Sequence, residues 1–173
     1  MEITSLDMAV IDIEKALQTQ MYYIALVCTL SLIDICSALE SKDGTTDKYA
    51  YMNWYKTHLG PHYTWLSDQD CYGLRCGMLH QGILDPAVRN MPQSRWARIG
   101  FILTPGGSQL RQLASSDHYF TGLAEFCRDV VARVKDWANS KKGDPVVKKN
   151  GQRLMRLHPQ GIPPHITGIP ILS

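Results

Sequence analysis

An arginine and a histidine lie five positions apart in the stretch "LSDQDCYGLRCGMLHQG", which spans residues 66 to 82: they are Arg75 and His80. A guanidinium can bind a phosphate through two parallel hydrogen bonds, and a histidine can move protons near neutral pH. Together they are a minimal set for cleaving a phosphodiester without a metal ion, provided that the 2′-hydroxyl of RNA supplies the nucleophile. The pair is therefore a candidate catalytic centre.

Signals at both ends of this stretch predict a helix from about residue 68 to 81. Ser67 followed three residues later by Asp70 is a capping-box pattern, and Gly82 stands where a glycine commonly ends a helix. On such a helix the arginine and the histidine are about 140° apart around the axis, so they flank a common edge. The long arginine side chain allows both heads to reach one phosphate beside the helix.

Three further residues of this helix are candidates for supporting the pair. Tyr72 lies one turn before Arg75, and its hydroxyl can reach the same phosphate, although packing in the core is an equally good interpretation. Asp68 can orient Arg75 across two turns, or can simply interact favourably with the helix dipole at the N-terminus. Cys76 follows Arg75 directly and shares a helical face with His80.

A zinc site is the competing interpretation of the same residues. Cys76 and His80 are four positions apart, and so are His58 and His62. Cysteine and histidine are the ligands that zinc prefers. Because the cysteines are not closely spaced in pairs, as they commonly are in zinc sites, we expect neither a metal nor another cofactor here.

The rest of the chain supplies helices that would position the pair. Apolar residues recur at three- and four-residue steps over residues 5 to 40 and 117 to 140, which is the period of an α-helix. The first of these segments is one long helix or two in succession. The aromatic segment over residues 47 to 59 also reads as helical, up to the break at Gly60 and Pro61. The sequence therefore predicts an all-α bundle.

Two segments lack the helical period. Residues 83 to 115 contain three prolines and two adjacent glycines around the run "ARIGFIL", which predicts an irregular insertion with room for a short hairpin. Residues 143 to 173 are rich in proline and glycine, which predicts an extended tail that needs another surface to become ordered. We expect a helical domain over residues 1 to 142 followed by this tail.

Composition narrows the class of protein. The 173 residues are 45% hydrophobic and 20% charged, which is typical of one soluble domain. The N-terminus has no pattern of a secretory signal, and the most apolar run, "MYYIALVCTLSLIDIC", is interrupted by Asp34 and reads as a buried helix. Five cysteines, an odd number spread through apolar segments, fit reduced thiols. A cytoplasmic location follows as the expectation.

The charge is unevenly distributed along the chain. Residues 1 to 88 hold five Lys and Arg against 11 Asp and Glu, whereas residues 89 to 173 hold 13 against five. A basic half can attract the phosphates of a nucleic acid. It is also compatible with an ordinary solvated surface, which is the more common reason for such an excess.

The motif in "YGLRCGMLHQG" resembles that of the HEPN superfamily, whose hallmark is Arg, four to six residues and then His on a helix of an α-helical bundle. The resemblance covers about residues 5 to 140, and the motif is its one specific feature. It implies a metal-independent endoribonuclease with Arg75 and His80 as the active-site pair. It also implies a homodimer in which the motif helices face one another, with RNA as substrate and, in toxin–antitoxin or phage-defence systems, an antitoxin protein as partner.

The residue after the arginine keeps a second interpretation open. Active members of the superfamily often have a polar residue where this chain has Cys76, and a thiol is a poor substitute for an amide in orienting a phosphate. Some members are non-catalytic scaffolds. The alternative is therefore a non-catalytic HEPN-like module that dimerises or binds RNA.

Overall fold

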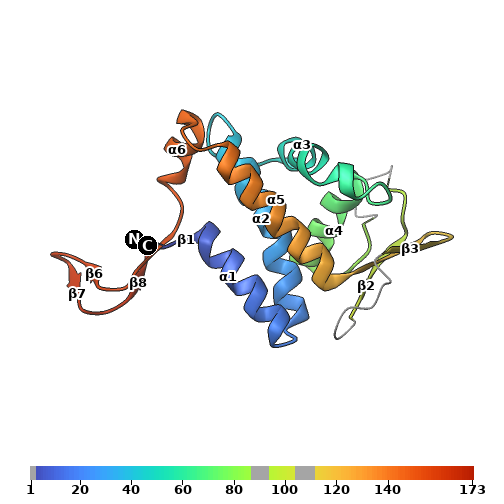
Figure 1. The fold of residues 1–173 in the computed structure, drawn as a ribbon, viewed down its shortest axis with the longest axis horizontal. Helices are drawn as coiled ribbons and strands as arrows, with labels where there is room; N and C mark the ends of the chain where they lie inside the picture. The colour runs from blue at the N-terminus through green and yellow to red at the C-terminus, as the bar shows by residue number, and fades with distance from the viewer. Residues whose placement is uncertain (1–2, 87–93, 104–111) are drawn as a thin grey trace.

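The computed structural model describes residues 3–86, 94–103 and 112–173. Within these ranges the chain forms six α-helices, one short 3-10 helix and three small sheets (Figure 1). The expected all-α class is therefore wrong, because helices and strands are both present. Where the predicted insertion falls on residues 87–93 and 104–111, it lies outside the described residues.

Two helices in succession form the N-terminal segment. They are α1 (Ser5–Gln18) and α2 (Tyr22–Glu40), and the break between them contains Gln20 at a left-handed φ of 58°. Helix α2 is long and apolar enough to cross a membrane by length and composition, but half of its most apolar window is buried in the body. It packs against α1, α3, α4, α5 and α6, which makes it the central helix of the core.

The helix that carries the arginine and the histidine has the predicted limits. Helix α3 (Lys48–His58) and a 3-10 turn (Gly60–His62) lead into α4 (Asp68–Gln81). Ser67 and Asp70 form the reciprocal capping box, and Gly82 ends the helix at a φ of 69°. The prediction of a helix from residue 68 to 81 is confirmed. It could be made from the sequence because each of these signals acts within a few residues of itself.

The chain then returns along α4 toward its N-terminal end. Two glycines of α4 make this close approach sterically feasible: a Cβ at Gly73 would collide with the carbonyl of Pro86, and one at Gly77 would lie 2.9 Å from the carbonyl oxygen of Ile83. Nearer the N-terminal end of α4, the buried carboxylate of Asp70 accepts a hydrogen bond from the backbone N–H of Arg95 at 2.9 Å.

A three-stranded sheet follows. It consists of β2 (Arg98–Ile102), β3 (Gln112–Ser115) and β4 (His118–Gly122), in the order β2-β4-β3, with β2 parallel and β3 antiparallel to β4. The predicted helix over residues 117 to 140 is therefore wrong in its first turns, because β4 precedes α5 (Leu123–Ser140). Tyr, Phe and Thr in β4 favour a strand once neighbouring strands are present to pair with it.

The C-terminal segment is also more structured than predicted. Its first part is α6 (Pro145–Gly151), whose buried Asn150 donates hydrogen bonds to the carbonyls of Leu39 and Ser41 at 3.0 and 2.7 Å. The element thus docks on the C-terminal end of α2. Four carbonyls at a helix end need partners outside the helix, and the Asn150 amide supplies one of them.

The last 18 residues, 156 to 173, form what we call the C-terminal arm. Its strands are β5 (Arg156–His158), β6 (Gly161–Ile162), β7 (Ile166–Thr167) and β8 (Ile171–Leu172). Strand β5 lies between β8 and the N-terminal β1 (Ile3–Thr4), and β6 pairs with β7. The arm projects from the helical body (Figure 1), and no residue of it is buried.

A candidate active site where α4 meets α2

The arginine of α4 reaches across to α2. Arg75 Nε donates to Asp34 Oδ2 at 2.8 Å, and the two side chains are only 20% and 16% exposed. On the other side of the guanidinium, Nη1 lies 3.3 Å from Nε2 of His80. The predicted pair is thus brought together, with Asp34 as a third member.

His80 is exposed in the last turn of α4. Because a guanidinium only donates hydrogen bonds, Nε2 accepts the one from Arg75, and the ring proton of the neutral imidazole then lies on Nδ1. Protonation of Nε2 would break this hydrogen bond. In this tautomer the Nε2 lone pair of His80 faces the Arg75 guanidinium.

Tyr72 and Cys76 also surround the guanidinium. Its central carbon lies 5.9 Å from the centroid of the Tyr72 ring, and Nη1 lies 3.8 Å from Cys76 Sγ. Burial raises the pKa of Tyr72, and a hydrogen bond with Cys76 raises it further. Tyr72 also packs edge-on against Tyr51 with ring centroids 5.4 Å apart, so it belongs to both the core and the site.

Asp68 lies in the first turn of α4, and among the described residues it makes no hydrogen bond or ion pair with Arg75. The orienting carboxylate is Asp34 instead, a residue that in the sequence only interrupts an apolar run. A signal for it exists: a carboxylate inside an apolar helix is costly to bury unless it has a partner. Which partner that is depends on how α2 and α4 pack.

The electrostatics of the Asp34–Arg75 pair combine burial and attraction. Burial raises the pKa of Asp34, and the hydrogen bond and positive charge of Arg75 oppose that shift. Burial alone would lower the pKa of Arg75, but the hydrogen bond and charge of Asp34 raise it overall. The hydrogen bond from Arg75 Nε to Asp34 Oδ2 holds the guanidinium in a defined orientation.

The arrangement leaves part of the guanidinium available. Within the described part of the chain, Nη2 of Arg75 has no hydrogen-bond partner, while Nε is bound to Asp34 and Nη1 faces His80. A phosphate beside Nη1 and Nη2 would therefore meet two donors and the imidazole at once. Chemically, this set can bind an anionic phosphorus centre and move one proton at it.

The histidines of the alternative zinc interpretation do not gather around this site. His58 packs against Trp54 with the ring planes tilted by 41° and the centroids 4.7 Å apart, and burial lowers the pKa of His58. Over the described ranges, no group of three or more His, Cys, Asp or Glu side chains is placed to hold a metal ion. All five cysteines are free thiols.

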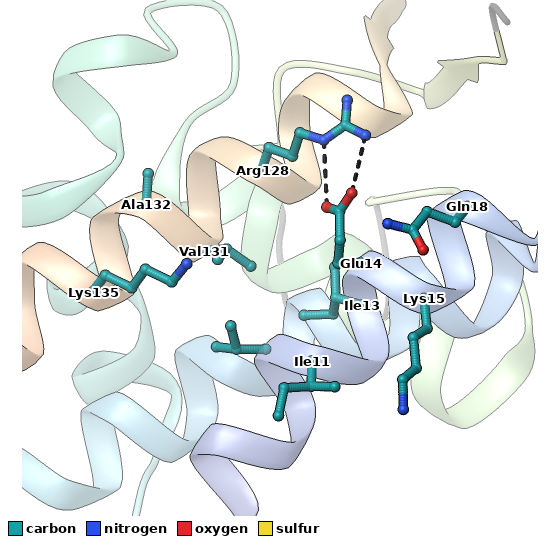
Figure 2. A pocket seen from close by; sticks show the side chains of 10 residues that line it. Ile11, Ile13, Glu14, Lys15, Gln18, Arg128, Val131, Ala132 and Lys135 are labelled. Carbon is teal, nitrogen blue, oxygen red and sulfur yellow. Dashed lines mark hydrogen bonds and ion pairs between the residues drawn. The ribbon is translucent and has the colours of Figure 1, made fainter.

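A groove of about 630 Å³ lies elsewhere, between α1 and α5 (Figure 2). Its walls are joined by an ion pair in which Arg128 Nη2 lies 3.4 Å from Glu14 Oε1. Apolar side chains, two lysines and a glutamine complete it: Val10, Ile11, Ile13, Val131, Ala132, Lys15, Lys135 and Gln18. Its lining includes neither Arg75 nor His80, and no histidine or cysteine, so it is the weaker candidate for acid–base chemistry.

Comparison with known proteins identifies no relative of this chain. No family model matches the chain, and neither a curated protein nor a solved structure is significantly similar to it.

Proposed function

We propose that the protein is a metal-independent endoribonuclease of HEPN type, with Arg75 and His80 as its active-site pair. The observation that carries the proposal is the 3.3 Å approach of Arg75 Nη1 to His80 Nε2, on a guanidinium whose Nε is held by Asp34. A cation, a proton carrier and an orienting carboxylate are thereby assembled at one partly exposed place. Such a preorganised donor set is what stabilisation of a charged transition state requires.

The reaction uses a nucleophile that RNA itself carries. The 2′-oxygen attacks the adjacent phosphorus and loses its proton to a base, while the bond from phosphorus to the 5′-oxygen breaks and that oxygen takes up a proton. The products are a 2′,3′-cyclic phosphate and a 5′-hydroxyl. Arg75 would stabilise the negative charge on the non-bridging oxygens, and His80 would serve as the base or as the acid.

One histidine can fill only one of the two proton-transfer roles in a single step. A homodimer through the motif helix α4 would bring a second His80 and a second Arg75 to the same cleft, because a two-fold axis repeats every residue of a self-complementary patch. In this proposal RNA is the substrate. An antitoxin protein would be the regulatory partner in a toxin–antitoxin or phage-defence role, as the motif resemblance implies.

A second function is favoured by a specific contact. The charge of Arg75 is already balanced by Asp34 at 2.8 Å, and the neighbouring residue is Cys76 rather than an amide. A guanidinium whose positive charge is balanced by a nearby carboxylate attracts a phosphate less strongly. The same geometry would then serve a non-catalytic dimeric or RNA-binding module.

Substitution of the histidine separates the two functions. In the endoribonuclease, His80→Ala should lower the cleavage rate of single-stranded RNA by about a hundred- to ten-thousandfold, because positioned acid–base catalysis typically contributes that much. The fold should persist, since His80 is exposed. Arg75→Lys should also be strongly impaired, because an ammonium lacks the planar pair of donors. Cleavage rates and the 2′,3′-cyclic phosphate end would be measured with and without EDTA.

The matched control is His62→Ala, which removes another exposed histidine outside the site. This variant should cleave at the rate of the unsubstituted protein. RNA binding without cleavage by the unsubstituted protein would favour the module instead. Cleavage that persists in His80→Ala, or that requires added magnesium, would contradict the catalytic role of the pair.

A further inference from the structure

An arginine outside the proposed catalytic pair rests on two tryptophans. The guanidinium carbon of Arg95 lies 4.9 Å from the ring centroid of Trp65 and 4.9 Å from that of Trp96. Trp96 is only 4% exposed and stacks on Tyr119, with centroids 5.6 Å apart. Trp65 is 44% exposed. Contacts therefore run from the buried Tyr119, through Trp96 and Arg95, to an indole at the surface.

The backbone around this cluster is held in place from two sides. The indole N–H of Trp96 donates to the carbonyl oxygen of Trp65 at 2.7 Å, and the backbone N–H of Arg95 donates to Asp70 Oδ1 at 2.9 Å. The same Asp70 carboxylate accepts from the hydroxyls of Ser67 and Ser94, each at 2.6 Å. Arg95 and Trp65 are thus preorganised, so a ligand would lose little by ordering them.

The charge of Arg95 is not balanced by a neighbour. Among the described residues its side chain has no ion pair, whereas Arg98, three residues later, pairs with Asp85 at 3.2 Å. A guanidinium stacked on aromatic rings keeps the N–H groups in its plane free to donate outward. The cluster therefore offers an exposed indole beside an exposed arginine that has no ion pair within the part of the chain that the structure describes.

We propose that Trp65 and Arg95 bind single-stranded RNA, with an unpaired base against the exposed indole and a phosphate at the guanidinium. Stacking on aromatic side chains and contact with arginine are how proteins bind single strands without reading their sequence. In a duplex the base faces are covered by neighbouring bases, so paired RNA cannot use the indole in this way. The excess of 13 basic over five acidic residues in positions 89 to 173 favours a nucleic acid over an acidic peptide.

This inference rests on the proposed endoribonuclease and specifies its substrate as unpaired RNA. Asp70, which holds Arg95, and Arg75 are five residues apart on α4, which is about 7.5 Å along the helix axis and about 140° around it. A short oligonucleotide can span that distance. The cluster would hold the strand, and the cleavage chemistry would take place at Arg75 and His80.

Binding can be measured apart from cleavage. The probe is a short fluorescent oligoribonucleotide with 2′-O-methyl groups, which lacks the attacking hydroxyl, and the readout is anisotropy with the full chain. Trp65→Ala should weaken binding by about five- to a hundredfold, the usual effect of losing one stacked base. Arg95→Gln should also weaken binding, because the phosphate loses its cationic partner. Trp65→Phe should retain most of the affinity. The controls are Arg98→Gln, which makes the same charge change nearby, and Tyr49→Ala, which removes a 74% exposed aromatic.

Each outcome bears on one claim. Equal binding of the oligonucleotide by Trp65→Ala and the unsubstituted protein would overturn the inference, as would equal binding of the same oligonucleotide in a duplex. Competition by an acidic peptide but not by unlabelled RNA would also overturn it, by making a protein the ligand. Where Trp65→Ala does not fold by circular dichroism, Arg95→Gln decides. Trp65-dependent binding by a protein that never cleaves RNA would remove the proposed function and leave only the binding of unpaired RNA at Trp65 and Arg95.

Discussion

Partial burial disfavours the charged form of Arg75, and the ion pair with Asp34 favours it. Its guanidinium touches Asp34 on α2 and His80, Tyr72 and Cys76 on its own helix. Of these residues, Arg75 and its three neighbours on α4 all lie between positions 72 and 80. The fifth, Asp34, is 41 residues away, and it is the one that determines where the guanidinium points.

Asp34→Asn should therefore impair RNA cleavage without unfolding the protein. The amide keeps the size of the side chain but loses the charge that orients Arg75, so we expect the cleavage rate to fall roughly tenfold or more. The acid limb of the pH profile would give a second readout. Because burial raises the pKa of Asp34, its carboxylate is lost at a higher pH than that of an exposed aspartate as the solution is acidified.

Cleavage by the unsubstituted protein should thus decline as the pH falls through the raised pKa of Asp34, and the part of that decline due to Asp34 should be absent in Asp34→Asn. The measurement is the cleavage rate against pH for both proteins. A matched control is Asp43→Asn, an exposed carboxylate whose pKa is lowered by hydrogen bonds to Thr45. Identical profiles for Asp34→Asn and the unsubstituted protein would contradict the orienting role.

Helix α4 is closely packed on two sides. Asp34 and the rest of α2 meet its Arg75 face, and the segment after Gly82 passes over Gly73 and Gly77. The glycines matter because the returning backbone occupies the space of a side chain. Residues 83–86 thus run back along α4, and Asp70, one turn before Gly73, accepts a hydrogen bond from the backbone N–H of Arg95.

Gly73→Ala should accordingly destabilise the protein, although alanine is the better helix former. The added Cβ would collide with the backbone of Pro86, which cannot move aside as a flexible side chain could. We expect a loss of about 1 to 3 kcal/mol in the free energy of unfolding, as is typical of overpacking. Chemical denaturation followed by circular dichroism measures it, with Gly60→Ala as control, since a Cβ there meets nothing closer than 3.8 Å. Equal stability of Gly73→Ala and the control would show that the segment is not packed as described.

Buried cysteine thiols make the stability of the whole protein depend on pH in the alkaline range. Burial raises the pKa of Cys71 to about 12 and that of Cys127 to about 11, from 9.0. Between pH 9 and pH 11 the two thiols stay protonated in the native protein, whereas they ionise in the unfolded chain. The unfolded state then binds fewer protons, so the free energy of unfolding falls as the pH rises above 9.

The melting temperature should therefore decrease steadily from pH 9 to pH 11. Each such thiol contributes up to about 1.4 kcal/mol per pH unit. Cys127→Ala should reduce the slope by the share of one thiol, and native Cys71 should not react with a thiol reagent at pH 8. A melting temperature that is constant over this range would show that these groups are not buried in solution.

The helical body should not depend on the C-terminal arm. No residue from 156 to 173 is buried, so truncation after Met155 removes little apolar contact. We expect the helical circular dichroism signal to persist and the melting temperature to change by less than about 4 °C. Truncation after Ser140 is the contrasting variant, because it also removes the buried Asn150 and its two hydrogen bonds to the end of α2. A large loss of stability in the variant truncated after Met155 would show that the arm supports the helical body.

The elements that could be predicted from the sequence are those with local signals. Helix α4 is the clearest case, because Ser67, Asp70 and Gly82 act on backbone within a few residues of themselves. The apolar stripe of α5 and the helical periodicity of α1 and α2 are local in the same sense. Strand β4 is the opposite case: His118–Gly122 continues an apolar pattern that suits a helix, and pairing with β2 and β3 makes it a strand.

The candidate site divides in the same way. The sequence by itself placed Arg75, His80, Tyr72 and Cys76 together, because residues on adjacent turns of one helix are neighbours wherever that helix packs. Only the tertiary structure decided that Asp34 rather than Asp68 orients the arginine, and that Arg95 lies on Trp65, 30 residues earlier. Such pairs depend on which faces of distant elements meet, and that is set by packing of the whole core rather than by the residues of the pair.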